Sequence, residues 1–245
     1  MNRLFLLSLI AILSFSVQAQ PKKQKDEKNL KFGIKAGAGY SQITDLSKVL
    51  VSESYYTNYT FKNSNTWGGY GSIFLNYKFE ETISAIQAEL SYSRLGNKLH
   101  YSDVDSLNYD FIIKYEYMNF EIFYKVYVFH GLNLGIGPRI GFNLSPGALY
   151  YTSNGEARFG PDIRIQQQMR DVLKGRSNFS LGVCLGYEFP IGLTLDARYY
   201  YGLSDVLETE VNNFHFIENK NAGRSLQFAV GYVLPYDLKF FKRKR

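Results

Sequence analysis

The sequence contains a single cysteine and, after its first 20 residues, no long apolar segment. Cys184 is the only cysteine among 245 residues, so no disulfide can form within the chain and the fold must be stable without one. Beyond the N-terminal segment no apolar run reaches about 18 residues, which excludes a membrane-spanning helix from that part of the chain. The remaining length of about 225 residues suits one all-β domain.

The body of the chain also lacks a basic stretch. The formal net charge is +6, but the basic residues are unevenly placed. Of the 28 Lys and Arg residues, ten lie in two terminal clusters and one more is Arg3. Only three of the 22 Asp and Glu residues lie beside these clusters. The body is nearly neutral, which excludes nucleic acid as a partner. Charge clusters of this kind are typical of solvated extensions, with contact to lipid headgroups or to a periplasmic protein as the alternative. The ten residues are Lys22, Lys23, Lys25, Lys28, Lys31, Lys239, Lys242, Arg243, Lys244 and Arg245.

The N-terminal segment has the pattern of an export signal. Arg3 precedes an apolar run from Leu4 to Val17 that only serines interrupt, and the small residue Ala19 follows. This pattern predicts a secretory signal peptide over residues 1–19, and no cysteine near the cleavage point suggests a lipid anchor. Residues 20–29 are then expected to form a basic periplasmic extension, and residues 236–245 a basic C-terminal tail.

Eight segments alternate between apolar and polar residues with the period of a β-strand. The clearest is "NLGIGPRIGFNL", with an apolar residue at every even position from Leu134 to Leu144. Tyr and Phe, which favour strands, number 21 and 19. The eight predicted strands cover residues 30–43, 67–79, 84–95, part of 111–129, 133–144, 179–189, 192–203 and 224–234.

The connections between these strands alternate strictly between short and long. Tight turns follow the second, fourth and sixth strands, whereas residues 42–66, 96–110, 145–178 and 204–223 form long connections, one with a possible short helix at 162–173. Outer-membrane barrels have brief periplasmic turns and long extracellular loops. We therefore predict an eight-stranded antiparallel transmembrane β-barrel over residues 30–235, with short periplasmic turns and long extracellular loops.

The two faces of the strands favour this membrane barrel over a soluble sandwich or a lipocalin-like barrel. The polar face is rich in glycine, which suits a narrow lumen where small residues must offset large ones. The glycines are Gly37, Gly39, Gly69, Gly71, Gly135, Gly137, Gly141, Gly182, Gly186 and Gly231. The apolar face carries aromatic residues near the strand ends, as the girdles at membrane interfaces require. They include Tyr40, Trp67, Tyr77, Tyr92, Tyr187, Phe189 and Tyr232.

If the apolar face meets lipid, eight charged side chains enter the lumen. They are Lys35, Glu89, Glu121, Lys125, Arg139, Glu188, Asp196 and Arg198. Buried charges persist only when paired, so this balanced set predicts a salt-bridged plug, and a proton or ion path is the alternative. Arg139 is expected to pair with Glu121 on the adjacent strand, with Glu89 as a second candidate. Pro138 should face lipid beside a bulge or a gap in hydrogen bonding, because it has no N–H to donate.

Signatures of catalysis are missing. His100, His130 and His215 are predicted to lie in separate loops and turns on both sides of the membrane, where they cannot converge on a metal or a serine. We expect no enzyme activity, no catalytic or cofactor-binding residue, no metal site and no cofactor. The external loops at 51–61 and 155–175 either bind a ligand or partner or only cover the barrel mouth.

Six pieces of the chain resemble the PorT-like family of outer-membrane barrels of Bacteroidetes. They are "GIKAGAGYSQI", "IQAELSYSRLGNKL", "YEYMNFEIFYKV", "GLNLGIGPRIGFNLS", "GYEFPIGLTLDARYYYGLSDV" and "FAVGYVLP". The resemblance implies an outer-membrane location, a surrounding of outer-membrane lipids and an eight-stranded barrel. Because the founding member belongs to type IX secretion, it also implies a structural or assembly role with a periplasmic or envelope protein as partner. A small barrel that binds through its extracellular loops, or a narrow passive pore, is the alternative.

Overall fold

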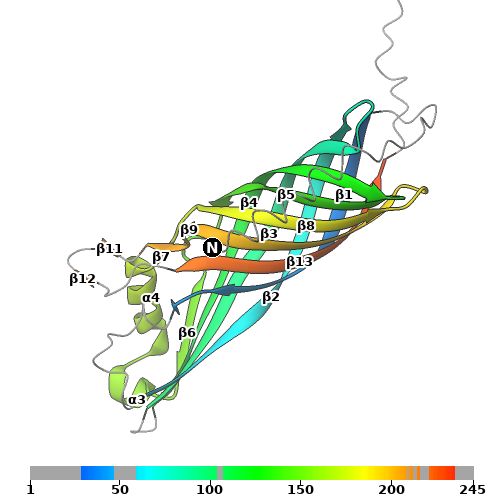
Figure 1. Ribbon diagram of the computed structural model, residues 1–245. Helices are drawn as coiled ribbons and strands as arrows, with labels where there is room; N and C mark the ends of the chain where they lie inside the picture. The colour runs from blue at the N-terminus through cyan, green and yellow to red at the C-terminus, as the bar shows by residue number, and fades with distance from the viewer. Residues whose placement is uncertain are drawn as a thin grey trace, which may run out of the picture.

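The computed structural model describes residues 29–46, 59–103, 107–208, 210–211, 214–215 and 221–234. The predicted signal peptide, residues 20–28 and the C-terminal tail lie outside these described residues. Most of the described chain is β-strand (Figure 1). No helix among the described residues is long and apolar enough to cross a membrane.

Eight long strands form one closed ring. Each is antiparallel to its neighbours in the order β3-β2-β1-β13-β9-β8-β5-β4, and β4 pairs again with β3 to close the ring. The fold is therefore the predicted eight-stranded antiparallel barrel. The strands are β1 (Leu30–Ile43), β2 (Tyr59–Lys78), β3 (Ser84–Asp103), β4 (Asn108–Phe129), β5 (Leu132–Asn143), β8 (Asn178–Glu188), β9 (Leu193–Asp205) and β13 (Ala222–Val233).

Shorter elements lie at the end of the barrel that carries the long connections (Figure 1). The helix predicted at 162–173 is present as α4 (Asp162–Val172), and α3 (Glu156–Phe159) precedes it. The short strands are β6 (Leu149–Ser153), β7 (Lys174–Gly175), β10 (Leu207–Glu208), β11 (Glu210–Val211) and β12 (Phe214–His215).

The opposite end of the barrel carries the tight turns. His130 and Gly131 alone connect β4 to β5, with φ angles of 30° and 96°. A two-residue hairpin of this kind needs positive φ at both positions, and a Cβ at Gly131 would lie 2.1 Å from the carbonyl oxygen of Glu188, so only glycine fits. The described chain starts and ends at this same end, because Leu234 N–H bonds to Phe32 O.

Three strands are longer than the sequence pattern predicted. β2 begins at Tyr59, and β3 and β4 continue to Asp103 and from Asn108, so the loop predicted at 96–110 is in fact a long hairpin. The alternation of apolar and polar residues continues, but the apolar residues move from the outer face of the strand to its inner face. Within the barrel Leu90 and Tyr92 point outward, whereas beyond residue 94 the apolar residues Leu95 and Leu99 point inward. An outward apolar face therefore ends near residue 94, although the strand continues to Asp103.

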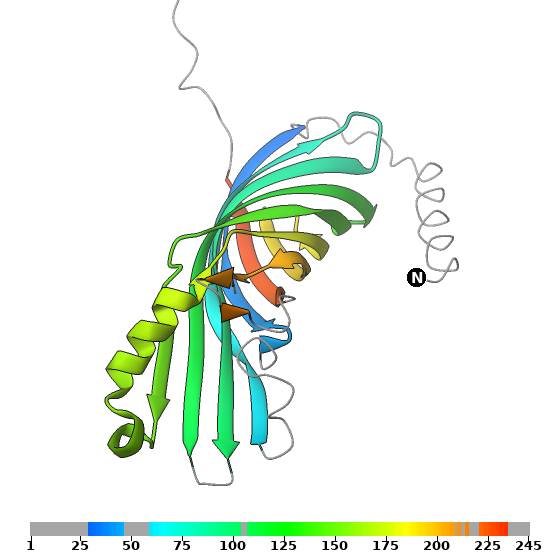
Figure 2. The ribbon, with the colours of Figure 1, turned by 90° about the vertical axis from the view of Figure 1, so that its left-hand side faces the viewer.

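These strand ends and β6 form a four-stranded sheet, which we call the extension. It comprises residues 59–65 of β2, 97–103 of β3, 108–113 of β4 and the whole of β6, with α4 beside β6 (Figure 2). Its inner face packs on residues from the connections and from the end of α4, and this cluster continues into the barrel mouth, where Leu95 and Tyr117 point inward. The buried members are Ile43, Leu46, Leu95, Leu99, Phe111, Ile113, Tyr115, Tyr117, Leu149, Leu173, Val206 and Leu207.

The outer face of the barrel is apolar, as a lipid-facing wall must be. Ile136 and Leu195 are 42% and 43% exposed, and the rings of Tyr40 and Trp67 meet at 5.0 Å in one of the predicted aromatic girdles. One prediction about the faces was wrong. Gly69 and Gly71 lie on the outer face with Trp67, and Tyr70 points inward instead, because the alternation of β2 runs unbroken through this segment, which pairs with β1 from Trp67 to Tyr77 without a register shift.

Pro138 lies on the outer face of β5, as predicted. The ladder between β4 and β5 skips Pro138 and Gly137 but resumes in the same register, so a gap is present without a bulge. On its other side β5 pairs with β8 continuously through this point. A closed barrel therefore tolerates a proline where one ladder alone is interrupted.

Candidate functional site: a charged plug and a sheet beyond the barrel

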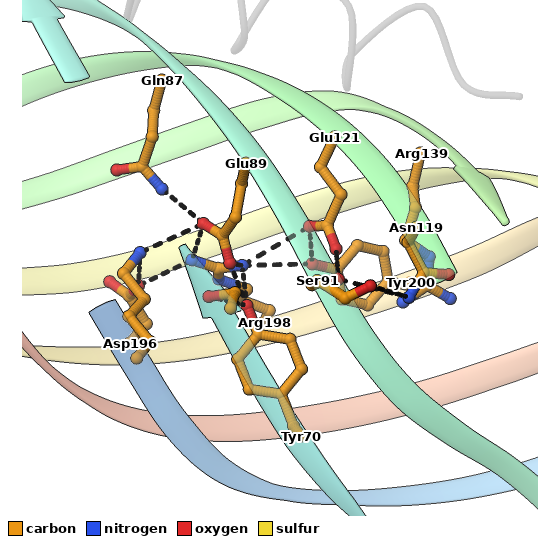
Figure 3. Close-up of polar contacts among 12 residues, drawn as sticks. Tyr70, Gln87, Glu89, Ser91, Asn119, Glu121, Arg139, Asp196, Arg198 and Tyr200 are labelled. Atoms are coloured by element: carbon orange, nitrogen blue, oxygen red, sulfur yellow. Dashed lines mark hydrogen bonds and ion pairs between the residues drawn. The ribbon is translucent and has the colours of Figure 1, made fainter. Parts of the chain in front are cut away.

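Arg198 of β9 forms the centre of a charge cluster that fills the barrel lumen (Figure 3). It is 1% exposed, and its two terminal nitrogens bind Glu89 of β3 with Nη1–Oε1 at 2.8 Å and Nη2–Oε2 at 2.9 Å. Nη2 also lies 2.8 Å from Asp196 Oδ2, and Nη1 lies 3.4 Å from Glu121 Oε2. Because β9 and β3 are four strands apart in a ring of eight, Arg198 spans the lumen.

Two lysines complete this cluster. Lys35 Nζ lies 2.5 Å from Asp196 Oδ2 and 3.3 Å from Glu89 Oε2, and Lys125 Nζ lies 4.0 Å from Asp196 Oδ1. Three cations thus face three carboxylates, so the charges balance where water cannot screen them. We call this set of six residues the plug: Lys35, Glu89, Glu121, Lys125, Asp196 and Arg198.

Neutral side chains satisfy the remaining oxygens of the plug. Tyr200 donates its hydroxyl to Glu121 Oε2 at 2.5 Å, Ser91 donates to Glu121 Oε1 at 2.6 Å, and Gln87 Nε2 donates to Glu89 Oε2 at 2.7 Å. Tyr70 hydrogen bonds to Glu89 from the β2 wall. None of these four neutral residues is among the charged side chains that the sequence predicts for the lumen. The sequence does indicate where three of them point. Gln87 and Ser91 lie two residues before and after Glu89, and Tyr200 lies two residues after Arg198, so the period of a strand places them on the same lumen-facing side.

Arg139 faces the lumen, but its predicted ion pair is wrong. It is 5% exposed and lies opposite Glu121 in the register of β4 and β5, yet among the described residues it lies within 4.0 Å of no carboxylate. Its Nε donates to Ser180 Oγ at 3.1 Å, and its guanidinium stacks 3.6 Å from the centre of the Tyr200 ring. Arg139 and Glu121 extend side by side from neighbouring strands, whereas Arg198 reaches both Glu89 and Glu121 from the opposite wall.

Glu188 also lies apart from the plug, at the tight-turn end of the barrel. Its Oε1 lies 2.5 Å from Lys31 Nζ, and Tyr127 donates its hydroxyl to Oε2 at 3.1 Å. Lys31, a member of the basic N-terminal cluster in the sequence, thus lies within β1 and forms an ion pair. The pair is separate from the plug because both residues lie near the ends of their strands.

The plug closes the lumen at its level. Glycines on the lumen wall provide the room, since a Cβ at Gly182 would lie 2.8 Å from the Tyr200 ring and one at Gly231 would lie 2.5 Å from Lys35 Cγ. A cavity of about 10 Å³ lies toward the tight-turn end, lined in part by Asn76, Asn133 and Thr194. This volume holds about one water. At the plug itself side chains fill the lumen, since Arg198, Glu89 and Glu121 are at most 1% exposed.

The predicted absence of metal ligands can be compared with the described residues only. Among them, no group of three or more His, Cys, Asp and Glu side chains could hold a metal ion. His130 lies in the β4–β5 turn as predicted, but His100 lies within β3 rather than in a loop. His100 Nδ1 lies 2.9 Å from Asp110 Oδ1.

The extension has a polar outer face and an aromatic inner face. On the outer face Lys98 Nζ lies 2.9 Å from Asp110 Oδ2. Partial burial opposes ionisation of Asp110, but the hydrogen bonds from Lys98 and His100 outweigh it and lower the pKa of this carboxyl. On the inner face four rings are in contact across the four strands, with centres 5.2, 4.4 and 5.3 Å apart, in the order Phe61, Tyr101, Tyr109 and Tyr151, and the middle pair is stacked. A polar outer face indicates water, so the extension lies beyond the bilayer.

The comparison with known protein families agrees with this architecture. A family model described as an outer membrane protein beta-barrel domain matches residues 18–208. Among solved structures, the chain is similar to Neisserial surface protein A at 12% identity, with 84% of this chain and 100% of that chain covered and a TM-score of 0.40. OprG from Pseudomonas aeruginosa is 10% identical, with 86% and 98% covered and a TM-score of 0.43. Ail of Yersinia pestis, in complex with a heparin analogue, is 14% identical, with 84% and 100% covered and a TM-score of 0.39. No curated protein sequence matches the chain.

Proposed function

The chain belongs to the family of outer membrane protein β-barrel domains, and from this premise we propose that it is a non-enzymatic, sealed barrel that presents the extension to an extracellular partner. It is a protein of the outer membrane. Short turns of such barrels face the periplasm and long connections face outward, which places the extension outside the cell. The signal peptide over residues 1–19 belongs to the same proposal, because an outer-membrane barrel must first be exported.

Two observations together support this proposal: side chains fill the lumen, whereas the extension is a folded sheet that packs on an apolar cluster. Arg198, Glu89 and Glu121 are at most 1% exposed, which disfavours the narrow passive pore. By contrast, β3 continues for about seven residues past Gly96 into a sheet with its own apolar core, far more than a turn that only joins two strands needs. Binding residues are commonly carried by elements that a rigid scaffold holds in place.

The first experiment asks whether the extension contacts a partner in intact cells. A photo-reactive residue at Thr152, on the outer face of the extension, should crosslink a discrete partner, whereas the same residue at Ile136 on the barrel wall should not. The crosslink should be lost when residues 97–113 are replaced by a two-residue Asn-Gly turn, which fits because Gly96 and Lys114 are paired across β3 and β4. Heat-dependent gel mobility of the shortened variant then verifies that its barrel remains closed. Crosslinks that are the same at Thr152 and Ile136 would contradict the proposal.

A role in protein secretion is the second candidate, and the observation that favours it is the resemblance to PorT-like barrels. The six matching pieces lie mainly in the barrel strands, so a partner in that role would contact the barrel or its periplasmic side. Deleting the gene should then leave cargo proteins in the periplasm, and the variant without residues 97–113 should restore their secretion. If secretion is unchanged by the deletion, this second candidate is excluded and the first is unaffected.

A further inference from the structure

Helix α4 lies along the free side of the edge strand β6 (Figures 1 and 2). β6 pairs with β4 on one side and is the last strand in the sheet order. Alternate residues of a strand direct their N–H and C=O groups to opposite sides, so Leu149, Tyr151 and Ser153 direct theirs away from β4. A sheet edge of this kind is a template for an added strand.

Three side chains of α4 satisfy the backbone of this edge in succession. Asp162 Oδ2 accepts from Ser153 N–H at 2.6 Å. Gln166 Oε1 accepts from Tyr151 N–H at 3.0 Å. Arg170 Nε donates to Leu149 O at 2.9 Å. Each of the three edge residues therefore has one outward backbone group bonded to the helix.

The spacing of these residues along α4 matches the spacing of their partners along β6. Asp162, Gln166 and Arg170 are four apart, which places them on one stripe of the helix with a rise of about 6 Å per step. Their partners on β6 are two apart, and two residues of a strand rise about 6.8 Å. The chemistry also matches the edge groups, because the two acceptors Asp162 and Gln166 face N–H groups and the donor Arg170 faces a carbonyl. The stripe thus takes the place of a neighbouring strand.

We infer that α4 is an edge guard, and that the edge of β6 pairs with a second copy of this chain when the guard is removed. The segment Leu149–Ser153 reads LYYTS, which has high β propensity and no charge. The segment can also pair with the same segment of a second copy. An antiparallel two-fold contact centred on Tyr151 would place Leu149 opposite Ser153 and set the N–H of Tyr151 against the C=O of Tyr151 in the other copy. This inference goes beyond the proposed function and does not depend on it.

The test replaces the guard stripe and measures the oligomeric state. We expect the variant D162A/Q166A/R170A of the full chain, purified in detergent, to form dimers whose protein mass by light scattering is about twice that of the wild type. In detergent micelles two barrels can meet in either orientation. The matched control is R164A/Q167A/D171A, which removes the same three kinds of side chain from the exposed side of the same helix and should leave the mass unchanged.

A second change separates edge pairing from other association. Adding S153P to the triple variant removes the N–H that faced Asp162 and blocks an added strand, so the mass should return to that of the wild type. A triple variant that stays monomeric with an intact barrel overturns the inference, and so does association that S153P leaves unchanged.

If the extension unfolds in the triple variant, the single variant Q166A still tests whether α4 protects the edge of β6. Its Tyr151 amide should exchange hydrogen about fivefold faster than in the wild type, since one hydrogen bond contributes about 1 kcal/mol. The Thr152 amide, which faces β4, should exchange at the unchanged rate. Equal exchange at Tyr151 in the two proteins would show that the edge does not rely on α4.

Discussion

Arg198 holds Glu89 through two parallel bonds, of 2.8 and 2.9 Å, that cross from one wall of the barrel to the opposite wall. Paired bonds between a guanidinium and a carboxylate are strong and directional. Because Asp196 and Glu121 contact the same guanidinium, one side chain links strands β3, β4 and β9 through the lumen. This link is the basis of the first prediction.

Replacing Arg198 by Met should destabilise the barrel by about 3–5 kcal/mol, because it leaves buried carboxylates without their main cation. The measurement is the urea unfolding midpoint in detergent or lipid. In the double variant R198M/E89M one stranded carboxylate is gone, so the loss should be smaller than the sum of the two single losses. Strict additivity of the two changes would show that Arg198 and Glu89 do not interact.

Replacing Arg139 by Met should cost less, roughly 1–2 kcal/mol. Arg139 contributes a stacking contact with Tyr200 and one hydrogen bond to Ser180, and its loss leaves no carboxylate unpaired. The same unfolding measurement compares R139M with R198M. A loss at Arg139 as large as that at Arg198 would indicate that Arg139, and not Arg198, is the partner of Glu121.

Arginine introduced on the barrel wall should be costly, although the wall is exposed in the isolated chain. Leu195→Arg and Ile136→Arg should each destabilise by about 2–4 kcal/mol near the middle of the bilayer. Thr152→Arg, on the outer face of the extension, should change stability by less than about 0.5 kcal/mol because that face meets water. Unfolding in lipid vesicles measures all three. A neutral result at both wall positions would mean that this face does not meet lipid.

The extension should be able to lose its structure while the barrel stays closed. Tyr101 is 8% exposed, stacks on Tyr109 and meets Phe61 edge-to-face, so Tyr101→Ala should destabilise the extension by about 3–5 kcal/mol. Limited proteolysis should then cut β3 or β4 beyond the barrel rim, and heat-dependent gel mobility should be unchanged. Loss of that mobility in the variant would show that the two parts fold as one unit.

The sequence predicted the barrel well because lipid imposes one consistent pattern on every strand. Positions such as Ile136 and Leu195 must be apolar, and Pro138 could be placed outward from the same alternation. The extension was missed because water outside the bilayer reverses the pattern, so that Leu99 points inward and His100 outward. Alternation alone does not reveal where the membrane ends.

The partners inside the lumen were less predictable than the faces. Glu89, Glu121 and Arg139 were correctly placed on one face of adjacent strands, but which cation reaches which carboxylate depends on the barrel's width. The predicted ring of eight strands already places the strand of Arg198 opposite that of Glu89, but the sequence does not show that the guanidinium reaches across the lumen to this carboxylate. Neighbours in a sheet follow from sequence order, whereas contacts across a barrel follow from its closure.

The central claim, that the barrel is a sealed scaffold, is tested most directly by ion conductance in a planar lipid bilayer. The wild-type chain should show no steady conductance, because Arg198 and Tyr200 are fully enclosed at the plug. R198A/Y200A, which removes both side chains, is the positive control and should conduct if it keeps its heat-dependent gel mobility. The predicted result is no conductance for the wild type and measurable conductance for the variant. A steady wild-type conductance equal to that of the variant would contradict the account.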